Sequence, residues 1–180
     1  MNNPTPQNIF TSILYKNTPA AIAQLHGNKD NPNLLGFVSF YNTPFGGILV
    51  NAEVYGLPDY FRSELSSKET VIKRISTMSP LSNSNFYGMH IHEFGDCTPP
   101  FSQTGSHYNP TNTAHPEHAG DMPPLLSNNG YAWMCFYTGR LRMEDIIGKS
   151  VVIHGMRDDF TTQPAGDSGE KIGCGVIQSV

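Results

Sequence analysis

Short, mostly hydrophobic segments recur along the chain between polar, turn-forming stretches, which is typical of β-strands. In residues 131–137, one face would carry Tyr131, Trp133, Cys135 and Tyr137, and the other Ala132, Met134 and Phe136. Similar segments rich in β-branched, aromatic or small residues are bounded by Asn, Pro or Gly. We expect strands at 21–25, 35–41, 47–54, 88–92, 131–137, 149–154 and 172–180.

Two regions depart from this pattern, an N-terminal extension over residues 1–19 and an insertion over residues 59–85. Ser66–Glu69 has the form of a capping box, and apolar residues follow at helical spacing. These apolar residues are Val71, Ile72, Ile75 and Met78. The insertion is therefore predicted to contain a short helix, and it is too small to hold a core of its own.

Many short strands, joined by turns and two long loops, favour an all-β fold. We expect a Greek-key antiparallel β-sandwich or barrel of about eight strands, in a single domain that covers residues 1–180. The composition agrees, because 17 Gly and 14 Pro with only 14% charged residues suit many turns and few long charged helices.

Charge and hydropathy exclude several classes of partner. The formal net charge of −4 gives no general basic character, so nucleic acid is not expected as a partner. No apolar run reaches the roughly 20 residues of a membrane-spanning helix. The first residues do not resemble a signal peptide, so the chain as written is expected in the cytoplasm, or outside it if a leader has been removed.

Six of the seven histidines lie between positions 90 and 154. Imidazole is the commonest metal ligand in proteins, so this clustering indicates a metal site. His90 and His92 would project from the same face of one strand, because side chains alternate with a period of two. By itself, such a pair is equally typical of surface histidines.

The loop after that strand holds a second group of metal-binding residue types, His107, His115, His118 and Asp121. Three neutral imidazoles and one carboxylate form the closed tetrahedral set that suits a structural zinc. Taken alone, this segment could also be a solvated polar loop. His154, at the end of its strand, would by itself be typical of a packed or surface residue. It is a candidate ligand only together with the other histidines.

Taken together, these segments resemble the copper/zinc superoxide dismutase family. The matching stretches are Gly88–Asp96, Gly105–Pro110, His118–Asp121, Gly148–Asp159 and Gly173–Ile177. They occur in the family's order, and the resemblance extends loosely from Ala21 to Val180 outside the insertion. By position it implies the copper ligands His90, His92, His107 and His154. It likewise implies the zinc ligands His107, His115, His118 and Asp121.

The resemblance also implies an activity, the conversion of two superoxide ions to dioxygen and hydrogen peroxide by redox cycling of the histidine-bound copper. Zinc would be structural, and His107 would bridge the metals and exchange a proton at its copper-side nitrogen. Asp158 would link His90 to His115. Cys97 would form a disulfide with Cys174, as in bacterial members.

Lys171 stands where the family usually carries an arginine beside copper. Lysine keeps a positive charge for the anionic substrate but lacks the planar, multi-donor fork of arginine. With His107 it is a candidate catalytic residue, and we expect activity to survive at a lower rate. The third cysteine, Cys135, is expected to be a small buried hydrophobic residue.

Other functions remain open at this point. The main alternative is a copper- and zinc-binding relative without turnover, acting as a metal buffer, although all four copper positions are filled here. Another is a structural or interaction module that uses the insertion as its contact surface. A hydrolytic zinc enzyme is less consistent, because four protein ligands leave no open position on zinc. Whether the chain forms a homodimer is also left open.

Overall fold

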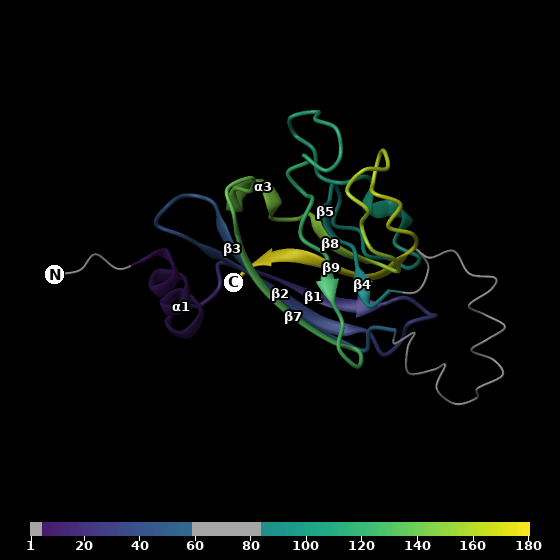
Figure 1. The fold of residues 1–180 in the computed structure, drawn as a ribbon, viewed down its shortest axis with the longest axis horizontal. Helices are drawn as coiled ribbons and strands as arrows, with labels where there is room; N and C mark the ends of the chain where they lie inside the picture. The colour runs from purple at the N-terminus through teal and green to yellow at the C-terminus, as the bar shows by residue number, and fades with distance from the viewer. Residues whose placement is uncertain (1–4, 59–83) are drawn as a thin grey trace.

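The computed structural model describes residues 5–58 and 84–180, and its main element is a curled antiparallel sheet of seven strands (Figure 1). The strands follow the order β5-β8-β9-β1-β2-β3-β7. Their bounds are β1 Ala21–Gly27, β2 Leu35–Asn42, β3 Ile48–Tyr55, β5 Met89–His92, β7 Tyr131–Thr138, β8 Ser150–His154 and β9 Lys171–Ser179. The prediction of a mostly β, antiparallel fold is therefore confirmed.

Several smaller elements accompany this sheet. A two-stranded sheet pairs β4 (Phe86–Tyr87) with β6 (Leu125–Leu126), and a short helix α3 (Met143–Ile146) precedes β8. A 3-10 turn, η1 (Ser102–Thr104), lies in the loop after β5. Strands β4 and β6 escaped prediction because two residues are too few to show a period. The helix expected in the insertion lies outside the described residues.

Side chains on one face of β2 and β3 form part of the core. Along β2 and β3 the inward-facing side chains are fully buried, among them Val38, Phe40, Val50, Ala52 and Val54. On the other side of the curled sheet they meet the buried face of β5 and β8 within one hydrophobic cluster. The strands that carry metal-binding side chains are thereby fixed by packing.

The N-terminal extension contains a helix, α1 (Pro6–Lys16), that the sequence analysis did not predict. Thr5 caps it by accepting a hydrogen bond from the backbone of Asn8, and Ile13 packs against the outer face of β2 and β3. With a single fully buried residue, the helix gives only a weak periodic signal. Cys135 borders the same contact and is half-buried, so the expectation that it is buried was wrong.

Two long loops lie beside each other at one end of the sheet, over β5 and β8 (Figure 1). The first joins β5 to β6 and the second joins β8 to β9. Cys97 of the first loop forms a disulfide with Cys174 of β9, with 5.5 Å between their Cα atoms. Within the described residues, no helix combines the length and hydropathy required to cross a membrane.

Candidate metal centre

The two loops and strands β5 and β8 bring six histidines and one aspartate into two adjoining clusters. In each cluster the possible ligand atoms lie within 4.8 Å of one another. The first cluster is His90, His92, His107 and His154, and the second cluster is His107, His115, His118 and Asp121. His107 belongs to both, and every histidine of the two clusters is buried.

Backbone pairing places the first loop against β5. The amide of Tyr108 donates to the carbonyl of Ile91, and the amide of Ile91 donates to the carbonyl of Gly120. A Cβ at Gly120 would lie 2.3 Å from the Ile91 oxygen, so only glycine permits this approach. The pairing sets His107 beside the strand that carries His90 and His92.

Two nitrogens of the first cluster face each other with no proton between them. His92 Nδ1 donates to the carbonyl of Gly105 at 2.9 Å, and His154 Nδ1 donates to the carbonyl of Gly169 at 3.2 Å. Because a carbonyl only accepts, both neutral rings carry their proton on Nδ1 and leave Nε2 unprotonated. The two Nε2 atoms are 3.2 Å apart, a repulsive arrangement unless a cation joins them.

The other two members of the first cluster each leave one buried nitrogen without a partner. His90 Nε2 donates to Asp158 Oδ2 at 2.9 Å, and His107 Nδ1 donates to Asp121 Oδ1 at 2.7 Å. His90 Nδ1 and His107 Nε2 then have no hydrogen-bond partner among the residues that the structure describes. Such unpaired buried groups are rare, and here they complete a set of nitrogens that fits a metal ion.

Protonation does not offer an alternative to a metal in the first cluster. Burial, followed by the charge of neighbouring histidines, holds the pKa values of His90 and His92 well below their usual range. Burial likewise lowers the pKa of His154 to about 4. At neutral pH these imidazoles are uncharged, which is the state that binds a metal.

The second cluster gathers around the carboxylate of Asp121. Its oxygens lie 2.7 Å from His107 Nδ1, 3.0 Å from His115 Nδ1 and 3.2 Å from His118 Nδ1. His115 Nε2 donates to Asp158 Oδ1 at 2.9 Å, so this ring lies between two carboxylates. Three imidazole nitrogens and one carboxylate gathered in this way form a donor set that suits zinc.

Asp158 connects the two clusters through one histidine of each. Its carboxylate is buried and accepts hydrogen bonds from His90 and His115, one from each cluster. Gly166 lies directly against it, since a Cβ on Gly166 would be 2.0 Å from Asp158 Oδ1. A buried partner of this kind fixes the tautomer and the orientation of both imidazoles.

Comparison with known proteins identifies the family. The profile described as copper/zinc superoxide dismutase (SODC) matches residues 60–177. The chain belongs to the copper/zinc superoxide dismutase family. Membership makes the protein an oxidoreductase with copper and zinc as cofactors.

Individual relatives agree with the profile. The copper/zinc superoxide dismutase 3 of Arabidopsis thaliana is 33% identical over an alignment of 133 residues that covers 65% of this chain and 79% of that protein. The copper/zinc superoxide dismutase of Legionella pneumophila is 27% identical over an alignment of 164 residues that covers 87% of this chain and 85% of the relative. The crystal structure of a double mutant of a SOD-like protein from Bacillus subtilis matches with a TM-score of 0.66 and 25% identity, covering 88% of this chain and 97% of that one.

A cavity of about 490 Å³ opens onto the shared histidine of this superoxide dismutase family member, and Lys171 lines it. His92, His107 and His154 line the same cavity. The ammonium of Lys171 donates to Thr104 Oγ1 at 2.7 Å and to the carbonyl of Gly105 at 2.9 Å. Burial lowers the pKa of Lys171 from its usual value. Its ammonium is therefore held in place at the entrance to the first cluster.

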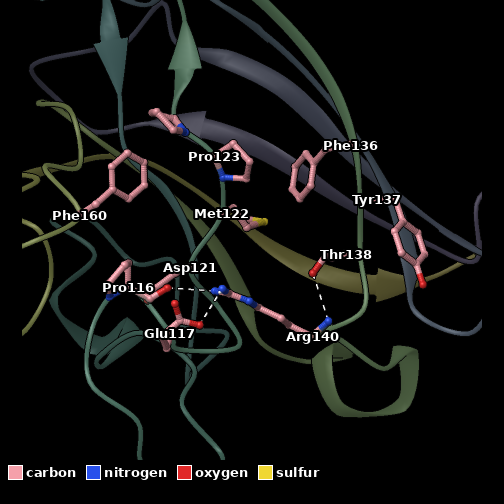
Figure 2. A pocket seen from close by; sticks show the side chains of 11 residues that line it. Pro116, Glu117, Asp121, Met122, Pro123, Phe136, Tyr137, Thr138, Arg140 and Phe160 are labelled. Carbon is pink, nitrogen blue, oxygen red and sulfur yellow. Dashed lines mark hydrogen bonds and ion pairs between the residues drawn. The ribbon is translucent and has the colours of Figure 1, made fainter.

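A second hollow, of about 370 Å³, lies beside Asp121 of the second cluster (Figure 2). Its walls are largely apolar, and Asp121 lines it as well. On its rim Arg140 donates to the carbonyl of Pro116 at 2.9 Å and to Glu117 Oε2 at 2.8 Å. Through these contacts Arg140 holds the segment that lies between His115 and His118 of the second cluster.

Sequence reasoning missed four residues that the structure places around the clusters, Thr104, Arg140, Gln163 and Gly166. Thr104 and Arg140 hold Lys171 and Pro116 respectively. Gln163 binds the backbone of His115, and Gly166 leaves room for Asp158. Only the Gly and Pro content of the second loop hinted at close packing there, and nothing in the spacing indicated which groups would meet.

Proposed function

We propose that the protein is a superoxide dismutase, which converts two superoxide ions and two protons to dioxygen and hydrogen peroxide. The observation that carries the proposal is the position of His107. Its Nδ1 faces the second cluster and its buried Nε2 faces the first, so a single imidazole serves both. In one transfer a superoxide ion is oxidised to dioxygen, and in the other a second ion is reduced and protonated to peroxide.

The donor sets assign the two metals. His90, His92, His107 and His154 would hold copper, since an all-imidazole set suits a copper ion that changes oxidation state. His107, His115, His118 and Asp121 would hold zinc as a closed set. Copper held at the first cluster would supply one-electron redox chemistry between Cu(II) and Cu(I).

Lys171 provides the positive charge that an anionic substrate requires. Of the three N–H groups on its ammonium, two are used by Thr104 and Gly105. The third is left for an anion in the cavity that Lys171 shares with His92, His107 and His154. The ammonium therefore both attracts superoxide and orients it toward the first cluster.

His107 holds the proton that the peroxide product needs. Its Nε2 is buried, makes no hydrogen bond within the described residues, and belongs to a ring that borders the cavity where substrate would enter. Its Nδ1 would bind the zinc of the second cluster, so the ring would keep its position while Nε2 gains or loses a proton. Asp158 keeps His90 and His115 in place during this exchange.

The test is superoxide removal by purified protein loaded with both metals, with bound copper and zinc measured on the same sample. We expect fast, copper-dependent turnover with about one of each metal per chain. Zinc-loaded protein without copper should bind its metal and show no turnover. Full loading with both metals and no turnover would instead show a copper- and zinc-binding relative that acts as a metal buffer.

A matched pair of variants tests the role of the shared imidazole. His107→Ala should abolish turnover and weaken the binding of both metals, because it removes one ligand from each cluster. His26→Ala changes a histidine outside the clusters, whose Nε2 donates to the carbonyl of Cys97, and should leave both metals bound. Unchanged zinc binding in His107→Ala would refute the assignment of His107 to both clusters.

A further inference from the structure

The side-chain amide of Gln163 binds both backbone groups of one residue in the second cluster. Gln163 Oε1 accepts a hydrogen bond from the amide of His115 at 3.1 Å, and Gln163 Nε2 donates to the carbonyl of His115 at 2.7 Å. The pair of bonds resembles the contact that a neighbouring β-strand would make. Both backbone groups of His115 are thereby satisfied by a single side chain.

The same loop also holds the His115 side chain. Asp158, five residues before Gln163, accepts the His115 Nε2 proton at 2.9 Å. The turn between the two is closed by backbone bonds, because the amide of Gly166 donates to Thr162 and the amide of Asp159 donates to Gly166. Backbone and side chain of His115 are thus fixed by one compact loop.

Other contacts hold the residues around His115. On the far side, Arg140 donates to the carbonyl of Pro116 at 2.9 Å and pairs with Glu117 at 2.8 Å (Figure 2). The Arg140 and Glu117 side chains are 43% and 66% exposed, and exposed ion pairs contribute little stability. The segment also has bonds of its own, since the amide of Glu117 donates to the carbonyl of Ala114 and Thr113 Oγ1 donates to the carbonyl of Glu117, each at 2.8 Å. These contacts do not involve the backbone groups of His115, which Gln163 binds.

We infer that Gln163 is a positioning residue for zinc, which sets the affinity of the second cluster by fixing the backbone of His115. The inference rests on the proposed function, since it assigns zinc to that cluster. Without the amide, the His115 segment would have to be ordered when the metal binds, at a cost in conformational entropy. Residues that support a ligand in this way typically change metal affinity by about 10- to 100-fold.

The test compares zinc affinity in metal-free wild type, Gln163→Ala and Gln163→Met, by competition with a chromogenic chelator. Methionine keeps the length of the side chain and removes both hydrogen bonds. We expect both variants to bind zinc at least about 10-fold more weakly. Gln178→Ala, which removes an exposed amide on β9, is the control and should bind zinc like wild type.

A second measurement separates positioning from general destabilisation. Copper affinity of the first cluster is measured in the same variants, together with the visible spectrum of Co(II) bound at the second cluster. Positioning by Gln163 predicts an altered Co(II) spectrum and weaker zinc binding, with copper affinity nearly unchanged. An equal loss of both affinities would mean that Gln163 merely stabilises the fold and would overturn the inference.

The remaining outcomes are also distinct. Zinc affinity in Gln163→Ala and Gln163→Met equal to that of wild type would overturn the role of Gln163 and leave the proposed function standing. Wild-type protein that binds neither zinc nor Co(II) tetrahedrally would overturn the inference together with the zinc assignment of the proposed function.

Discussion

Gly166→Ala should damage the metal centre although glycine contributes no ligand. A Cβ at this position would lie 2.0 Å from Asp158 Oδ1 and 2.8 Å from His115 Nε2, while ordinary contact begins near 3.4 Å. The Asp158 carboxylate would have to retreat by about 1.4 Å, which is enough to break hydrogen bonds that now measure 2.9 Å. The backbone of Gly166 also has φ of +66°, which an alanine adopts only with strain.

The magnitude follows from the bonds that Asp158 would lose. It accepts from His90, from His115 and from the amide of Phe160, and bonds to a charged group contribute roughly 1.5–3 kcal/mol each. Losing two of them, with about 1–2 kcal/mol of backbone strain, predicts that the metal-free protein loses about 4 kcal/mol or more of unfolding free energy. Zinc affinity should fall about 10- to 100-fold, because His115 loses its orienting partner.

Gly148→Ala provides the matched control. Gly148 has φ of +80°, but a Cβ added there would have no atom within 4 Å, so alanine at this position meets strain without a clash. It should cost about 1–2 kcal/mol and leave zinc affinity unchanged. Guanidinium unfolding followed by far-UV circular dichroism gives the stabilities, and chelator competition gives the affinities. If Gly166→Ala lowered the unfolding free energy no more than Gly148→Ala does, the close contact of Gly166 with the Asp158 carboxylate would be wrong.

Other predictions concern the cavity, the disulfide and the effect of acid. Lys171→Met should lower kcat/KM for superoxide by about 10-fold and make kcat/KM less dependent on salt, whereas Lys171→Arg should raise kcat/KM. Stopped-flow rates at several ionic strengths check this prediction, and equal rates for wild type and both variants would contradict it. Cys97→Ser opens a loop of 77 residues and should cost about 4 kcal/mol in unfolding free energy, measured in guanidinium against the oxidised wild type; a loss below about 1 kcal/mol would contradict it. In the metal-free protein, burial lowers the pKa of His154 from 6.5 to about 4, so the unfolded chain takes up a proton first as the pH falls. The contribution of neutral His154 to the free energy of unfolding is therefore fully present above pH 6.5 and falls by roughly 3 kcal/mol by pH 4. Urea unfolding midpoints measured across that range would show the loss, and midpoints that do not change with pH would refute the prediction.

The strands and the histidine set could be predicted because both follow local rules. β-Branched and aromatic residues between Asn, Pro and Gly turns marked the strands to within one or two residues. His90 and His92 share a face because side chains along a strand alternate with a period of two. The helix α1 could not be predicted in this way, since its contact with the sheet buries Ile13 and little else fully. Its stability comes from packing on β2 and β3, which a single sequence does not reveal.

The residues that support the ligands escaped prediction for a different reason. Gln163 and His115 are 48 positions apart, and Thr104 and Lys171 are 67 apart. The first pair meets because two irregular loops pack side by side, and the second because the first loop packs against the start of β9. Loops carry no period from which such contacts could be inferred. Ligand spacing indicates which residues bind a metal, whereas the groups that orient them depend on the tertiary fold.

The structure also explains how lysine can stand where the family usually has arginine. The carbonyl of Gly105 accepts from His92 Nδ1 and from Lys171 Nζ, and its two lone pairs can serve both. One carbonyl thereby fixes the tautomer of a ligand in the first cluster and the place of the cavity's ammonium. The buried hydroxyl of Thr104 provides the second anchor for Lys171. Lysine thus keeps its positive charge at a fixed point. Compared with arginine, it leaves fewer N–H groups for the substrate, so we expect the lower rate to arise from weaker binding of superoxide.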